Sequence, residues 1–141
     1  MSNGTMPHNR INGQTSAESL LRKNLPPQDM EQELRAIGRV MHELDVIDEM
    51  GTLTGEMFYF GDNGIAFDEL RKWRSAAKEF SGHYFVQFLD KAYPRDPGFW
   101  ERRLADAIAS VPHAGLAAYD AKLVQELWVK RQASSETRPS G

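Results

Sequence analysis

The residues best suited to bind a metal ion lie close together in one acidic segment. His42 is followed by Asp45 and then by Glu49, and residues three or four apart share one face of a helix. Structural metal sites usually need four ligands, and no second histidine-rich segment supplies the missing ones. We therefore predict no metal site and no cofactor.

The segment Asp62-Asn63-Gly64 has the composition of a calcium-binding loop but not its spacing. When Gly64 takes the sixth position of such a loop, Tyr59 takes the first and Leu70 the twelfth, where carboxylates are required. Asp, Asn and Gly also tolerate the positive φ angles of a tight turn between two strands. We interpret the segment as a hairpin turn.

The candidates for nucleophilic catalysis are Ser75, Ser81 and Ser110, with His83 or His113 as the base. No nucleophile-elbow sequence surrounds any of these serines. The glycines lack the lysine and the spacing of a phosphate-binding loop. Cysteine is absent, which excludes disulfides and thiolate chemistry. The prediction is that the chain is not an enzyme, and a small enzyme with an unrecognised site is kept as the third hypothesis, after protein binding and nucleic-acid binding.

A basic helix supports an alternative hypothesis, nucleic-acid binding. The predicted helix 68–80, the turn at Ser81-Gly82 and a second predicted helix, 83–93, have the dimensions of a helix-turn-helix. The second helix is mostly apolar and carries Asp90, which would repel phosphate. The net charge of −3 does not indicate a polyanionic partner. The nucleic-acid-binding candidates therefore lie on the first helix: Arg71, Lys72, Arg74 and Lys78.

Amphipathic helices are the main elements that would position these residues. Apolar residues at helical spacing predict helices at 17–24, 28–50, 68–80, 97–111 and 116–131. The segment 83–93 is rich in aromatic residues, as a strand would be, but its length favours a helix. Aromatic residues and threonines on either side of the turn at 62–64 predict a β-hairpin over residues ~52–67. The predicted fold class is α+β, predominantly α, with about five amphipathic helices packed around one small β-hairpin.

Composition divides the 141 residues into one domain and two tails. Residues 1–14 and 133–141 are small and polar, so they cannot bury enough apolar surface to repay the entropy of ordering. A single domain is therefore predicted over 15–132. No apolar run approaches the ~18 residues of a membrane span, and no secretory signal is visible. We expect a cytoplasmic protein.

Aromatic residues exceed what a narrow core stripe on each helix requires. This excess favours a non-catalytic regulatory or adaptor protein that acts by binding another protein. The candidate partner-binding residues are Phe58, Tyr59, Phe60, Phe99, Trp100 and Trp128.

One apolar stripe also fits self-association. It lies on the predicted helix 28–50 and has the spacing of a short two-heptad seam. A homodimer through this helix is therefore a further hypothesis, with the seam residues Leu34, Ile37, Met41 and Leu44.

Overall fold

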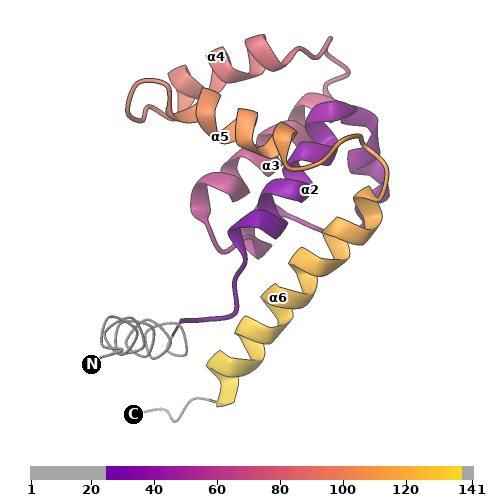
Figure 1. Ribbon diagram of the computed structural model, residues 1–141, viewed down its shortest axis with the longest axis vertical. Coiled ribbons are helices and arrows are strands. Elements are labelled where there is room, and N and C mark those ends of the chain that lie inside the picture. Colours follow the sequence, from indigo (N-terminus) through magenta and orange to yellow (C-terminus); the bar gives the residue numbers. More distant parts are fainter. Residues whose placement is uncertain (1–24, 138–141) are drawn as a thin grey trace, which may run out of the picture.

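The computed structural model describes residues 25–137, with side chains as far as residue 134, and in this part of the chain helices are the only regular secondary structure (Figure 1). The predicted tail 1–14 and the predicted helix 17–24 lie outside the described residues. The elements in chain order are α2 (Met30–His42), η1 (Leu44–Glu49), η2 (Gly55–Met57), α3 (Gly61–Ser75), α4 (Gly82–Ala92), α5 (Phe99–Ala109) and α6 (Ala117–Thr137), where η marks a 3-10 helix.

The predicted β-hairpin over ~52–67 is wrong, and with it the α+β fold class. Residues 52–60 form loops around η2, and Asp62-Asn63-Gly64 lies in the first turn of α3. Gly64 is needed there for close packing, because a Cβ atom on it would lie 2.3 Å from the carbonyl oxygen of Gly55. A glycine at a helix–loop contact and a glycine in a tight turn look alike in sequence.

The predicted helix 68–80 has shifted boundaries. Asp68 lies inside α3 rather than at its start, and its carboxylate accepts a hydrogen bond of 2.7 Å from the Gly55 amide. The helix ends at Ser75, and Ser81 begins α4 by accepting a hydrogen bond from the Tyr84 amide (3.1 Å). The helix predicted for 83–93 is confirmed.

Helix α2 is shorter than the predicted helix 28–50. It ends at His42, because Glu43 has extended backbone angles (φ −156°, ψ 107°), and the chain continues as η1. Neither glycine nor proline marks this break. The apolar stripe nevertheless continues through it, since Val46, Ile47 and Met50 are buried.

Helix α2 lies at the centre of the fold. It packs against α5 on one side and α6 on another, while α4 packs on α5 at the periphery (Figure 1). The approach of α2 to α5 depends on Gly38, where a Cβ atom would lie 2.1 Å from the Ala107 carbonyl oxygen. The largest fully buried apolar side chains come from these helices, from α3 and from the loops: Ile37, Ile47, Leu53, Phe67, Leu70, Phe85, Leu89, Trp100 and Leu104.

Candidate interaction surface

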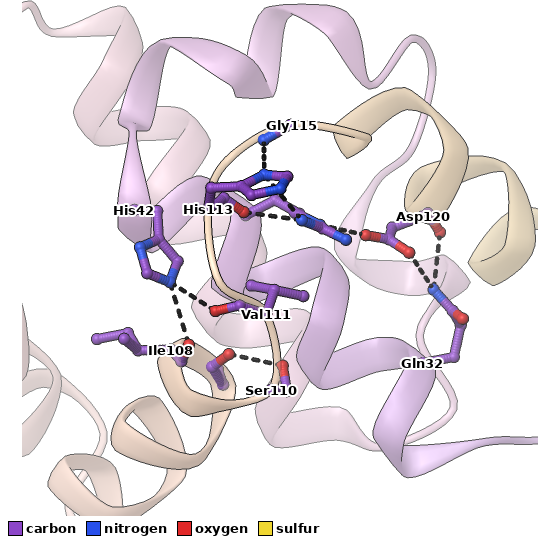
Figure 2. Close-up of polar contacts among 10 residues, drawn as sticks. Gln32, His42, Ile108, Ser110, Val111, His113, Gly115 and Asp120 are labelled. Atoms are coloured by element: carbon purple, nitrogen blue, oxygen red, sulfur yellow. Dashed lines mark hydrogen bonds and ion pairs between the residues drawn. The ribbon is translucent and has the colours of Figure 1, made fainter.

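A buried ion pair holds the start of α6 on α2 (Figure 2). Arg39 Nε lies 2.6 Å from Asp120 Oδ2, and the two side chains are only 8% and 2% exposed. Gln32 Nε2 donates to Asp120 Oδ1 at 3.0 Å, so both carboxylate oxygens are paired. Charge-assisted hydrogen bonds in such a dry setting fix geometry strongly. This cluster therefore sets the position of α6.

The same arginine fixes the turn between α5 and α6. Arg39 Nη1 donates to the His113 carbonyl at 2.8 Å, and His113 Nδ1 accepts from the Gly115 amide at 3.0 Å. His42 Nε2 lies 2.9 Å from the Val111 carbonyl oxygen, where α5 has just ended (Figure 2). The two histidines therefore have structural partners at this corner.

Arg131 provides a second anchor near the other end of α6. Its two terminal nitrogens donate to the carbonyls of Met57 (2.6 Å) and Pro27 (2.9 Å). Its guanidinium also lies 5.5 Å from the centre of the Tyr59 ring, a cation–π arrangement. Burial lowers the pKa of Arg131, and the nearby Glu33 and Tyr59 oppose that shift.

A buried carboxylate joins α2 to the loop before α3. Glu33 is 1% exposed, and it accepts from the amides of Tyr59 (2.6 Å) and Phe60 (3.3 Å) and from Asn63 Nδ2 (2.9 Å). Burial raises the pKa of the Glu33 carboxyl, although these hydrogen bonds and the charge of Arg131 lower it. Arg103 completes the cluster by donating to Asn63 Oδ1 at 2.6 Å.

The flank of α6 that these anchors leave uncovered carries an apolar stripe. Leu116 and Tyr119 are 63% and 56% exposed, and Leu123 and Leu127 are half-buried. Tyr119, Leu123 and Leu127 are four residues apart, which places them along one flank of α6. Leu116 lies in the turn just before the helix, with a left-handed backbone (φ 68°). We call these four residues the α6 stripe.

The six predicted partner-binding residues do not form one surface. Phe58 and Trp100 are buried in the core, and Trp100 Nε1 donates to the Tyr93 carbonyl at 2.8 Å. Phe60, Phe99 and Trp128 are half-buried. Only Tyr59 is exposed, at 38%, and Arg131 lies over its ring.

The predicted dimer seam lies largely inside the chain's own core. Ile37 is fully buried and Met41 is 9% exposed, while Leu34 and Leu44 are half-buried. A dimer through this seam stays a prediction. It would require α2 to leave contacts that it already makes with α5 and α6.

The basic residues of α3 have partners on the protein itself. Arg74 pairs with Asp48 (2.8 Å) and Asp45 (3.5 Å), and Lys72 pairs with Glu69 (3.3 Å). Lys78 lies 5.7 Å from the Trp73 ring centre. The remaining basic residue, Arg71, donates to the Leu53 carbonyl at 2.8 Å. Nucleic-acid binding through these residues also stays a prediction.

Within the described residues, no group of three or more histidine, aspartate or glutamate side chains is placed to hold a metal ion. None of the helices in this part of the chain is both long enough and apolar enough to cross a membrane. The buried titratable side chains Glu33, Arg39 and Asp120 connect elements that are distant in sequence.

Sequence reasoning did not identify the Arg39–Asp120 pair or the α6 stripe. One signal was available, since Asp120 falls among Ala117, Ala121 and Val124 on the apolar face of its helix. A carboxylate in that position needs a buried partner. The identity of that partner, on a helix far earlier in the chain, had no local signal.

Comparison with solved structures places the fold in a known class. The chain is similar to the N-terminal domain of DnaB helicase from Mycobacterium tuberculosis, with a TM-score of 0.70 and 24% sequence identity. The similarity covers 79% of this chain and 81% of that one. No protein-family model and no curated protein matches the sequence. The likeness establishes a shared all-helical fold.

Proposed function

We propose that this chain is a non-catalytic regulatory or adaptor domain that acts by protein–protein association, and that the α6 stripe is its self-association surface. The observation that carries the proposal is the exposure of Leu116, in the turn just before α6, and of Tyr119 on α6, 63% and 56%. The adjoining face of the helix is anchored by Asp120 and Arg131. Adjacent large apolar side chains on a rigid element are typical of an interface.

The geometry of α6 suits a twofold dimer. The helix has 21 residues, which corresponds to a length of about 31 Å. A second copy packed along the same stripe would bury these side chains against one another, and a twofold axis makes such a patch self-complementary. Anchoring by Arg39 and Arg131 lowers the entropy lost on association, because α6 is ordered beforehand.

The shared fold also suggests which protein this adaptor would contact. The similar structure is the N-terminal domain of a helicase, and two chains with one fold can present matching helix faces to each other. We propose that a DnaB-type helicase is the partner, bound through the same α6 stripe. Mixing the chain with that N-terminal domain and resolving heterodimers by native mass spectrometry tests this extension.

Charge placed on the stripe tests the self-association surface itself. The double variant Leu116→Glu, Tyr119→Glu should be monomeric at concentrations where the unmodified chain is dimeric, because the interface would bury carboxylates without partners. Size-exclusion chromatography with light scattering measures the mass. The control is Tyr84→Glu, since Tyr84 is 61% exposed but lies on α4. An unmodified chain that is monomeric, or a variant that is equally dimeric, would contradict the proposal.

A further inference from the structure

A separate groove runs between α4 and α5, with the end of α2 beneath it. Its volume is about 510 Å³, and its apolar lining includes Met41, Val86, Leu104 and Ile108. Ile108 is 38% exposed, although it belongs to a helix whose neighbour Leu104 is buried. The groove therefore presents apolar surface for which the described chain offers no covering element.

Two carboxylates stand beside this apolar floor. Asp90 on α4 and Glu101 on α5 both line the groove and are exposed. Neither forms an ion pair within residues 25–137, whereas Asp45, Asp48 and Asp62 elsewhere are each paired with an arginine. The complementary ligand would have large apolar side chains next to basic ones.

We propose that this groove binds the segment Ser16–Asn24 of a second copy of the chain. That segment lies outside the described residues and reads Ser-Ala-Glu-Ser-Leu-Leu-Arg-Lys-Asn. Leu20 and Leu21 match the apolar floor, and Arg22 and Lys23 match Asp90 and Glu101. The segment thus complements the groove, because two leucines are followed directly by two basic residues.

The reach of the chain assigns the segment to a second copy rather than to the same one. The described chain enters α2 from the side of the molecule opposite α4 and α5 (Figure 1). Leu21 stands four residues before Leu25 and can lie at most about 14 Å from it. The groove begins at Met41, and the rise along α2 from Met30 to Met41 is already about 16 Å.

This contact differs from the proposed dimer in its symmetry. A segment of one copy in the groove of the next is a heterologous contact, which continues from copy to copy until a ring closes or a filament forms. It uses α4 and α5, not the α6 stripe. The two proposals can therefore fail independently.

Fluorescence anisotropy with a labelled peptide of residues 14–25 tests the contact directly. The receptor is the full chain carrying Leu20→Asp and Leu21→Asp, whose own segment no longer competes. We expect saturable binding that weakens on the order of tenfold when Asp90→Lys and Glu101→Lys are added, since two attractive pairs become repulsive. Both side chains are exposed and unpaired, so the fold tolerates the change.

A charge exchange and a control make the result specific. The peptide with Arg22→Glu and Lys23→Glu should bind the lysine-substituted groove better than the unmodified peptide does. Asp106→Lys, an exposed residue of α5 outside the groove, should leave binding unchanged. A receptor that also carries Leu116→Glu and Tyr119→Glu should bind the peptide equally well, because the groove contains no residue of the α6 stripe. Peptide binding therefore does not depend on whether the α6 proposal is right. No saturable binding, or binding that ignores the charges at 90 and 101, would overturn the inference.

Discussion

At the scale of single residues, the buried charges connect helices that are distant in sequence. Arg39 and Asp120 are 81 positions apart, and Glu33 reaches Asn63 across 30 positions. Each buried charge has several partners, as burial in a low-dielectric interior requires. The expected effect of a substitution depends on which partner is left behind.

Removal of Asp120 should be among the most destabilising single changes. Asp120→Ala leaves the Arg39 guanidinium buried without its carboxylate, which we expect to cost about 3–5 kcal/mol of unfolding free energy. The matched control is Asp48→Ala, whose pair with Arg74 has side chains 58% and 38% exposed and should cost less than about 1 kcal/mol. Urea unfolding followed by circular dichroism measures both. Equal losses would contradict the structural role of the buried pair.

Glu33 should give the protein a distinctive pH dependence. Burial raises its pKa in the folded state, so the folded chain binds this proton more readily than the unfolded chain does. The contribution of Glu33 to the free energy of unfolding therefore increases as the pH falls from above its raised pKa towards the ordinary glutamate value. The contribution is lost when the pH rises above the raised pKa.

The comparison with Glu33→Gln isolates this contribution from the other carboxyl groups. The stability of the unmodified chain relative to the variant should improve as the pH is lowered from about 7 to about 4. Denaturant unfolding at a series of pH values provides the two curves. Parallel curves would mean that the pKa of Glu33 is the same in the folded and unfolded chains.

At the scale of elements, close helix contacts depend on glycines. Gly38→Ala should force α2 and α5 apart, since its Cβ would lie 2.1 Å from the Ala107 carbonyl oxygen. We expect a loss of about 1–3 kcal/mol or more. Gly61→Ala is the control, because nothing lies within 4 Å of its Cβ position and alanine favours helix. Thermal unfolding of the two variants should separate them clearly, and similar melting temperatures would contradict the packing described for Gly38.

Helices with a continuous apolar stripe were predictable from sequence, and the region around residues 52–67 was not. The predicted helices 83–93, 97–111 and 116–131 correspond to α4, α5 and α6. In contrast, Asp62-Asn63-Gly64 follows an aromatic segment and has turn composition, so local rules favour a hairpin. The deciding contact, Gly64 against Gly55, is tertiary and leaves no local pattern.

The sequence predicted that a surface of exposed apolar residues exists, but it did not identify which residues form it. Exposed apolar residues were expected, but Phe58 and Trp100 are buried, because the aromatic residues at helical spacing mainly fill the core. Tyr119 occurs in the predicted helix 116–131 with nothing to distinguish it from its neighbours. Its exposure follows from the anchoring of the adjoining face by Asp120 and Arg131, which is a property of the assembled fold.

At the scale of the whole molecule, we propose two separate association surfaces. The α6 stripe would form a twofold contact, and the groove between α4 and α5 would accept the segment Ser16–Asn24 of another copy. A chain with both contacts should form assemblies larger than a dimer. Leu20→Asp with Leu21→Asp should stop assembly at the dimer, as measured by light scattering. Larger assemblies that persist in this variant would contradict the groove contact.

A cysteine scan along the α6 stripe tests self-association through α6 directly. The chain has no cysteine, so single substitutions at Leu116, Tyr119, Leu123 and Leu127 each introduce a unique thiol. A position near a twofold axis faces its own copy and forms a disulfide on mild oxidation. We predict covalent dimers from at least one stripe position and none from Tyr84→Cys, which is exposed on α4 outside the groove. Failure of all four stripe positions to cross-link, or equal cross-linking at residue 84, would contradict association through α6.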